Sequence, residues 1–123
     1  MNQPVFSDLD DPLDRDYLER NYLALGCADV LADVAAMYLE SAPEKLSGMH
    51  EALNNANLEQ LGRLAHGLKG ESGSVGARQM TALAAFLEQS ARQGDLDACR
   101  HCIKDLAPAL DRVSSLLKQE FGA

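Results

Sequence analysis

Apolar residues recur at helical spacing along most of this chain, and this periodicity constrains the fold more than any other feature. Leu18, Tyr22 and Leu25 follow one another at i, i+4 and i+7, and Leu83 and Leu87 repeat the four-residue step. No stretch keeps the alternation of apolar and polar residues that is typical of a strand. Aromatic residues make up 5% of the chain and tryptophan is absent, which suits helix-on-helix packing better than a sheet. The sequence therefore predicts an all-α protein.

Helix-breaking residues divide the periodic stretches. Asp14 is a candidate N-cap of a short first helix, and Gly26 is a candidate stop. Pro43 falls inside the second stretch, whose apolar pattern resumes after it, so one long kinked helix is expected; Pro108 is expected to bend the last helix. The expected helices cover residues 14–25, 29–53, 58–75, 77–93 and 96–120. They predict an antiparallel four-helix bundle with a short additional N-terminal helix.

Two of these helices have apolar stripes that predict which residues enter the core. In the helix over 29–53 the stripe consists of Val30, Val34, Met37, Tyr38, Leu46, Met49 and Leu53. In the helix over 58–75 it consists of Leu58, Leu61, Ala65, Leu68 and Ser72. At 100° per residue, each set falls on one side of its helix, which we expect to face the bundle interior.

Length and charge limit the domain count and the class of partner. The 123 residues fit one domain over 14–123, preceded by a polar segment over 1–13 that is expected to be mobile. The net charge of −8 argues against nucleic acid or an anionic membrane as a partner, because both need a basic surface. No apolar run is long enough to span a bilayer, and the N-terminus has no signal-peptide pattern. The three cysteines do not have the spacing of a disulfide-bonded domain. We therefore expect a cytoplasmic protein with reduced thiols.

The segment "LAHGLKGESGSVGA", residues 64–77, places several glycines around one histidine. On the helix over 58–75, His66 lies on one face with Gly62 a turn before it, Gly70 a turn after it and Gly73 beyond. Lys69 is its i+3 neighbour on the same face. An interior glycine costs a helix about 1 kcal/mol relative to alanine. Such a face lets another macromolecule approach the imidazole closely.

The chemistry of this face favours phosphoryl transfer. A neutral imidazole nitrogen is a good nucleophile near pH 7. A phosphoryl group on His66 would bring negative charge, which Lys69 and, from the other flank, Arg63 would compensate. Phosphoryl transfer depends mainly on positioning and charge compensation, both of which these residues offer.

The stretch "AHGLKGESGSVGA" resembles the His-x-x-Lys-Gly…Gly signature of histidine-containing phosphotransfer (HPt) domains. The matching residues are His66, Lys69, Gly70 and Gly76. The flanking segments 38–53 and 83–98 are also similar to helices of that family, and the resemblance extends from about residue 18 to residue 117. It implies an intermediate of a His–Asp phosphorelay, a phosphoryl carrier that binds no ATP and has no kinase activity of its own.

The resemblance also implies roles for single residues. His66 would be phosphorylated through Nε2, Lys69 would stabilise the phosphoryl charge, and Gly70 would leave room for the partner. Glu88, at a position where several relatives have glutamine, would accept a hydrogen bond from Nδ1–H of His66. The implied partners are receiver domains of a hybrid sensor histidine kinase and of a response regulator, whose acidic pocket would supply Mg²⁺. We expect no cofactor on this chain and a monomer. Helical phase adds candidate receiver-binding residues, namely Gly62, Arg63, Gly70, Thr81, Ala84 and Ala85.

Two other classes of function compete with the phosphoryl carrier. A helical adaptor would bind a receiver or kinase domain without being phosphorylated, but it would need neither His66 nor Lys69. A metal-binding bundle would use the "CRHC" stretch, Cys99, His101 and Cys102, but no second pair of ligands is present elsewhere and zinc sites usually need four ligands.

Overall fold

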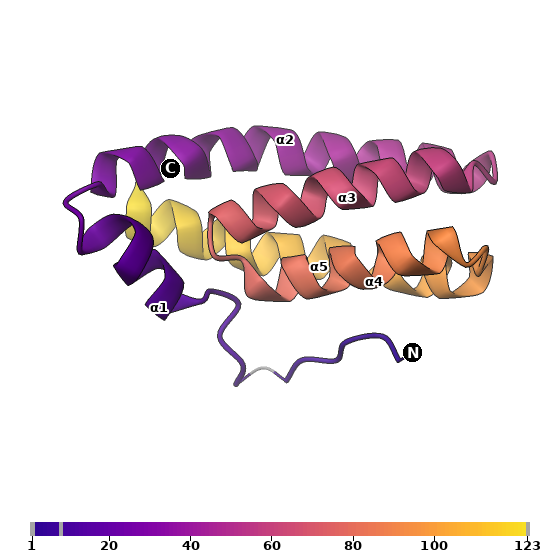
Figure 1. Ribbon diagram of the computed structural model, residues 1–123, viewed down its shortest axis with the longest axis horizontal. Helices are drawn as coiled ribbons and strands as arrows, with labels where there is room; N and C mark the ends of the chain where they lie inside the picture. Colours follow the sequence, from indigo (N-terminus) through magenta and orange to yellow (C-terminus); the bar gives the residue numbers. More distant parts are fainter. Residues whose placement is uncertain (1, 8, 123) are drawn as a thin grey trace.

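The computed structural model describes residues 2–7 and 9–122. Within these residues every regular element is helical, as predicted. The elements are α1 (Arg15–Leu18), the π-helical turn η1 (Glu19–Leu23), α2 (Ala28–Asn54), α3 (Leu58–Ser74), α4 (Arg78–Arg92) and α5 (Leu96–Phe121). Helix α3 packs against α2 and α4, and α5 closes the bundle by packing against the same two helices (Figure 1). The prediction of a four-helix bundle with an extra N-terminal helix is therefore confirmed.

Helix ends follow local chemistry. The side chain of Asp14 accepts a hydrogen bond from Tyr17 N, as expected of an N-cap, and Asn57 and Asp95 cap α3 and α5 in the same way. Gly76, with φ +67°, forms the turn between α3 and α4. A Cβ there would also lie 3.1 Å from the Leu18 side chain, so both its backbone conformation and its close packing require glycine.

The first expected helix is wrong in detail. Instead of one α-helix over residues 14–25, the chain forms a single α-turn followed by the wider π-helical turn η1. The backbone leaves this turn at Gly26, which has φ +71° as a helix stop often does. Pro43 and Pro108 lie inside α2 and α5, which each continue as one helix.

The apolar stripe expected for α2 is also wrong in part. Val30 and Met37 are 50% and 69% exposed. The core-facing residues are Leu31, Ala35, Tyr38, Ala42, Met49 and Ala52. Three alanines occupy part of the buried face, so α2 is rotated relative to the expectation and part of its large apolar stripe faces outward. The stripe of α3 is correct for Leu61, Ala65, Leu68 and Ser72, all buried, whereas Leu58 is half-buried.

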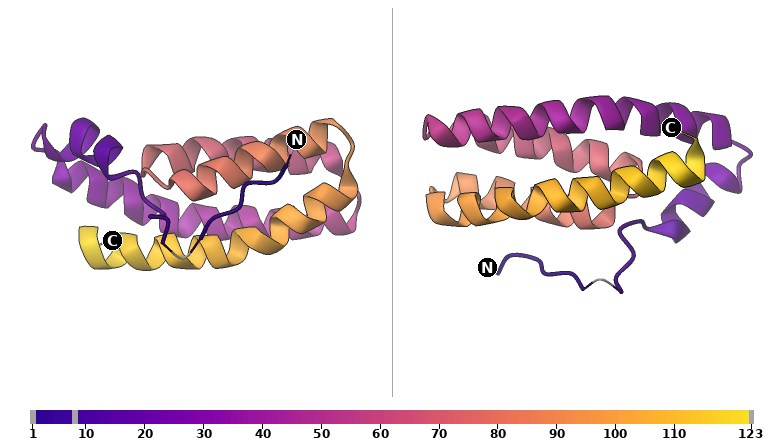
Figure 2. Two further views of the ribbon diagram at one scale, coloured as in Figure 1. Left: turned by 90° about the horizontal axis from the view of Figure 1, so that it is seen from below. Right: turned by 180° about the vertical axis from the view of Figure 1, so that it is seen from behind.

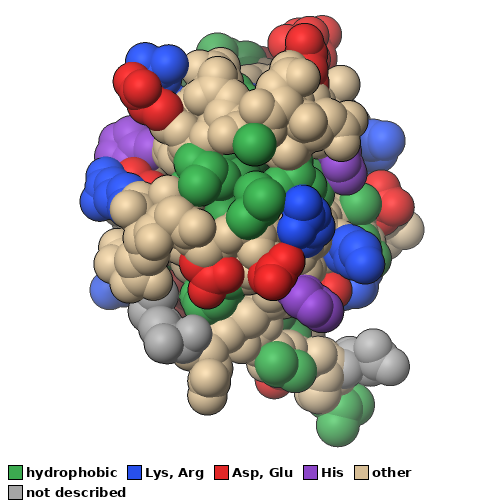
Figure 3. Space-filling model, turned by 90° about the vertical axis from the view of Figure 1, so that its right-hand side faces the viewer, with side chains coloured by type: hydrophobic (Ala, Val, Ile, Leu, Met, Phe, Trp, Pro, Cys, Tyr) green, Lys and Arg blue, Asp and Glu red, His purple; other side chains and the backbone are tan. Residues whose placement is uncertain are grey.

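The N-terminal segment lies along α4 and α5 (Figure 2). Arg78 Nε donates to Asp11 O at 2.7 Å, and Asp14 N donates to Gly76 O at 2.7 Å. Leu13 is fully buried, so the core extends one residue beyond the domain boundary expected at Asp14. The mobility of residues 1–13 stays a prediction. At the end of the bundle where α2 turns into α3 and α4 into α5, apolar side chains are framed by polar and charged ones (Figure 3).

Candidate functional site

His66 projects from α3 beside α4. Its side chain is 68% exposed, whereas Ala65 and Leu68 on the inner face of the helix are fully buried. This contrast follows from the helical repeat, which turns positions 65 and 68 inward and position 66 outward. Histidine at this position is therefore presented to solvent by a rigid helix rather than by a loop.

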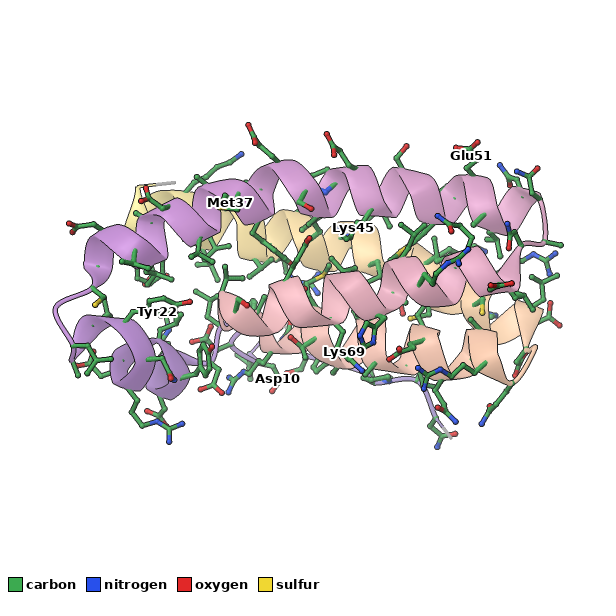
Figure 4. The ribbon with its side chains drawn as sticks, turned by 45° about the horizontal axis from the view of Figure 1, so that its top comes forward. Asp10, Tyr22, Met37, Lys45, Glu51 and Lys69 are labelled. Carbon is green, nitrogen blue, oxygen red and sulfur yellow. The ribbon has the colours of Figure 1, made fainter. Side chains whose placement is uncertain are left out.

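Glu88 of α4 binds three side chains at once. His66 Nδ1 lies 2.8 Å from Oε2, Lys69 Nζ donates to Oε1 at 2.7 Å, and Arg92 Nη2 donates to Oε2 at 3.0 Å. Glu88 is only 4% exposed. A buried carboxylate is costly unless it is paired and hydrogen-bonded, and these three donors meet that requirement. We call His66, Lys69, Glu88 and Arg92 the His66 cluster; Lys69 lies in front in Figure 4.

The charge state of Glu88 determines which ring nitrogen of His66 carries the hydrogen. The hydrogen bond from Lys69 lowers the pKa of Glu88, burial opposes this, and the hydrogen bond with His66 lowers it further. Glu88 is therefore ionised at neutral pH and can only accept hydrogen bonds. It follows that Nδ1 of His66 carries the hydrogen, and that in the neutral ring Nε2 holds the free lone pair.

The lowered pKa of Glu88 makes the stability of the fold depend on pH. A carboxyl group whose pKa is lower in the folded protein stabilises the fold above its ordinary value of 4.5 and loses this contribution as the pH falls through the folded-state pKa. We expect the difference in free energy of unfolding between wild type and Glu88→Gln to be constant from pH 7 to about 5 and to shrink below pH 4.5. Urea unfolding at a series of pH values measures it, and a difference that grows on acidification would contradict the assignment.

A surface hollow of about 620 Å³ adjoins His66 between α3 and α4. Its lining includes Gly62, Arg63, His66, Glu88 and Arg92. The Arg63 guanidinium bonds to Gln60 Oε1 at 3.1 Å and keeps a 67% exposed side chain. Arg63 also lies 3.5 Å from Glu59 Oε1, and Lys69 and Arg92 both pair with Glu88, so three cations face two acids around His66 and leave a small positive excess.

The glycines around His66 have different surroundings. A Cβ on Gly70 or Gly73 would meet no atom within 4 Å, so the surface there is open, as expected. A Cβ on Gly62 would instead lie 3.7 Å from that of Ala91, so Gly62 lies at the contact between α3 and α4. Gly67 lies beneath Lys45, whose Cε would be 2.9 Å from an added Cβ.

Three of the candidate receiver-binding residues come from α4, and the structure places them apart. Ala84 is fully buried in the core, so this prediction is wrong. Thr81 is half-buried and its Oγ1 donates to Ala77 O at 2.9 Å. Ala85 lines a separate hollow together with Asn2 and Pro4 of the N-terminal segment. Helical phase alone misplaced Ala84 because the packing of α4 rotates this residue inward.

Arg92 is the site residue that the sequence interpretation missed. It lies one turn after Glu88 on α4, at the i+4 spacing that favours an acid–base pair. This spacing could have predicted the pairing of Arg92 with Glu88. It could not predict that the pair lies beside His66, because that depends on the packing of α4 on α3.

The CRHC residues lie away from this cluster. Cys99 and Cys102 are buried, Cys102 Sγ bonds to Leu83 O at 3.2 Å, and burial raises the pKa of the Cys102 thiol to about 12. His101 is exposed on the outer face of α5. In the part of the chain that the structure describes, no group of three or more histidine, cysteine, aspartate or glutamate side chains is arranged to hold a metal ion. Over the same residues, no helix combines the length and apolarity needed to cross a membrane.

A four-helix bundle that exposes a histidine hydrogen-bonded to a neighbouring helix is the arrangement expected of a histidine-containing phosphotransfer domain. Comparison with known families agrees: the Hpt domain model matches residues 33–116, more than half of the chain. The chain therefore belongs to the Hpt domain family. It is also similar to histidine-containing phosphotransfer protein 2 of Arabidopsis thaliana, with 26% identity over 100 residues that cover 79% of this chain and 64% of that relative. No solved structure matched the chain.

Proposed function

We propose that this protein carries a phosphoryl group between the aspartates of receiver domains, through Nε2 of His66. The observation that carries the proposal is the exposed His66 ring, whose Nδ1 is held by the buried, ionised Glu88. Membership of the Hpt family supports a carrier in a phosphorelay. A surface histidine without a role would not need a buried carboxylate to fix its ring.

Phosphoryl transfer from an aspartate to His66 requires no proton transfer. The Nε2 lone pair of neutral His66 attacks the phosphorus of an aspartyl phosphate on the partner, and an N–P bond forms. The P–O bond to the aspartate breaks, and the carboxylate leaves with the bonding electrons. Nδ1 keeps its hydrogen, so the ring becomes a phosphoimidazolium whose positive charge faces the Glu88 carboxylate. Transfer to a second receiver is the same step reversed.

Lys69 and Arg92 supply compensating charge for the phosphoryl group. Each donates to Glu88 through one nitrogen, and a lysine ammonium has three donors while an arginine guanidinium has five. Donors remain for phosphoryl oxygens, which form strong charge-assisted hydrogen bonds. Each of the two side chains can therefore donate hydrogen bonds to the Glu88 carboxylate and to the phosphoryl group at the same time.

The partner is proposed to be the receiver domain of a hybrid sensor histidine kinase and that of a response regulator. A receiver presents an acidic pocket that holds Mg²⁺, and the positive surroundings of His66 complement such a pocket. The metal ion would belong to the partner, and this chain would bind no ATP. Its monomeric state and its location in the cytoplasm stay predictions.

Label transfer tests the proposal. The protein is incubated with Mg²⁺ and with each receiver domain of its own cell, phosphorylated with radioactive phosphate. We expect label on the wild-type protein that acid removes and base does not, as for phosphohistidine. Wild type that stays unlabelled with every receiver, while still binding one of them, would favour the adaptor and overturn the carrier.

Gly70 offers a test of the open surface around His66. Gly70→Ala should raise the free energy of unfolding by about 0.5–1 kcal/mol, because alanine favours the helix interior and its Cβ meets nothing. Gly70→Phe should keep the fold but slow transfer at least tenfold, because the ring would occupy the space that a receiver needs. Chemical denaturation and the label assay measure the two effects. Undiminished transfer by Gly70→Phe would show that the partner does not approach over this glycine.

A further inference from the structure

The hollow beside His66 extends along the groove between α3 and α4, away from the imidazole. Leu58, Gly62 and His66 line it at four-residue intervals along α3, and Ala91 and Arg92 line it from α4. From His66 to Leu58 the helix axis covers about 12 Å at 1.5 Å per residue. The volume of about 620 Å³ lies within the range of small-molecule sites. The hollow therefore has room for a ligand beyond the reacting ring.

The floor of this hollow is apolar and its walls carry cations. Helices α3 and α4 are antiparallel, and a Cβ on Gly62 would lie 3.7 Å from that of Ala91, one turn before His66. These two small residues make a floor that leads toward Leu58. Arg63 and Arg92 directly follow Gly62 and Ala91 in the sequence, so each wall presents one guanidinium group.

Both guanidinium groups can reach a ligand in the hollow. The side chains of Arg63 and Arg92 are 67% and 68% exposed. Arg92 donates to Glu88 through Nη2, and an arginine has five N–H donors, so donors remain for an anion. Arginine also forms strong charge-assisted hydrogen bonds with phosphate oxygens. A ligand with a phosphoryl group at one end and an apolar chain at the other matches these features.

An acyl phosphate has this structure. The aspartyl phosphate of a receiver is a mixed anhydride of a carboxylic acid and phosphoric acid, and a free acyl phosphate contains the same anhydride. Its phosphoryl group carries negative charge for Arg63 and Arg92, and its acyl chain can lie over Gly62 and Ala91. The reactive group is therefore the one that His66 already uses in the proposed function.

We propose that this hollow binds a small acyl phosphate and that His66 takes the phosphoryl group from it directly, without a receiver domain. The Nε2 lone pair attacks phosphorus and an N–P bond forms. The P–O bond to the acyl group breaks, and the carboxylate leaves with the bonding electrons. The step needs no oxidant or reductant. The proposal rests on the proposed function for one point alone, the nucleophilic role of His66.

One acidic side chain at the hollow opposes the donor. Glu59 lines the hollow, and its Oε1 lies 3.5 Å from Arg63 Nη1. The Glu59 side chain is 82% exposed, so this ion pair is weak. Its negative charge repels the phosphoryl group of a donor. Glu59→Gln should therefore raise the rate of labelling by an acyl phosphate about twofold to threefold, and a lower rate would contradict the placement of the donor beside Arg63.

Labelling in the absence of any receiver tests the proposal. The protein is incubated with acetyl, butyryl or hexanoyl phosphate, whose carboxylates are nearly equal leaving groups, and phosphohistidine is located by peptide mass spectrometry. His50 and His101 are exposed histidines and serve as internal controls. We expect label on His66 at a rate at least about tenfold above theirs. Phosphoramidate, which has no acyl group, measures the reactivity of the ring by itself.

The length of the acyl chain reports on the hollow. A fully buried methylene group favours binding about fourfold, and this hollow is partly open. We therefore expect hexanoyl phosphate to react about fivefold to tenfold faster than acetyl phosphate at equal, low concentration. Leu58→Asn should reduce this advantage to about twofold or less. Leu25→Asn is its control, because Leu25 is 68% exposed and lies outside the hollow.

A second pair of variants fills the hollow instead. In Gly62→Leu the new side chain occupies the floor, and its Cβ makes an ordinary contact with Ala91. Leucine also favours the helix over glycine, so the variant should fold, which circular dichroism checks. It should lose the advantage of hexanoyl phosphate and react with phosphoramidate within about twofold of wild type. Gly73→Leu, where a Cβ meets no atom within 4 Å, is the matched control and should keep the advantage.

Each outcome separates this proposal from the carrier function. Equal labelling of the three histidines, equal rates for the three acyl phosphates, or an unchanged chain-length advantage in Gly62→Leu would overturn binding in the hollow. An equal loss in Gly73→Leu would overturn it as well. If receivers label the wild type and no acyl phosphate does, the direct donor fails and the carrier function stands. If acyl phosphates label His66 and no receiver does, the carrier function fails and the direct donor stands.

Discussion

The His66→Gln variant should accept no phosphoryl label, a loss of at least about 1000-fold, because the amide nitrogen of glutamine has no nucleophilic lone pair. The fold should be unaffected, since the His66 side chain is 68% exposed. Glutamine can also hydrogen-bond in this position, so the change removes the nucleophile with little disturbance of its neighbours.

The chain supplies two matched controls for this variant. His50 on α2 and His101 on α5 are exposed histidines outside the His66 cluster. His50→Gln and His101→Gln should take label at the wild-type rate. If His66→Gln is labelled like wild type, or if one of the controls loses its label, the phosphorylated residue is not His66. Receiver binding by His66→Gln, measured separately, should remain, because glutamine is no larger than histidine and leaves the glycine face beside it open.

Replacing Glu88 should give the second-largest effect, and two substitutions separate its roles. Glu88→Leu removes the acceptor from Nδ1 and leaves the ring free to rotate and to change tautomer. We expect transfer to fall about 100-fold. Loss of a carboxylate that fixes a catalytic histidine costs up to about 10⁴-fold where the histidine moves a proton. Here no proton moves, so the expected loss is smaller.

Glu88→Gln keeps an oxygen that accepts from Nδ1–H but removes the negative charge. Transfer should fall only about tenfold, because the ring stays oriented while the phosphoimidazolium loses its counter-charge. The amide also cannot accept two cationic donors as well as a carboxylate does, so Lys69 and Arg92 should become more mobile. Single-turnover label transfer measures the rates. Equal rates for Glu88→Leu and Glu88→Gln would show that Glu88 does not orient the ring.

The rates of the two Glu88 variants can be interpreted only if both variants fold. Lys69 and Arg92 are 36% and 68% exposed at the side chain, so both can reach water when Glu88 is replaced. Neither cation is then left buried and unpaired, the situation that makes breaking a buried ion pair so destabilising. We therefore expect folded proteins from both substitutions, and rates that report on the site rather than on unfolding.

The local features of this protein follow directly from its sequence. The helical repeat and the scarcity of aromatic residues predicted a bundle, and Asp14 and Gly26 marked helix ends that the structure confirms. The same repeat placed His66 and Lys69 on one face of α3. These predictions need only the geometry of one helix and the conformational preferences of single residues, which depend on neighbours within about four positions.

The contacts between helices were decided by the tertiary structure. The sequence could not show that Arg92 would meet Glu88 beside His66, that Ala84 would be buried, or that Met37 would face solvent. Each of these depends on the rotation and offset of one helix against another. An alanine-rich helix such as α2 offers several nearly equivalent apolar faces, so its periodicity does not determine which one enters the core. Close packing selects one of them, because only one arrangement lets all the helices fit without voids.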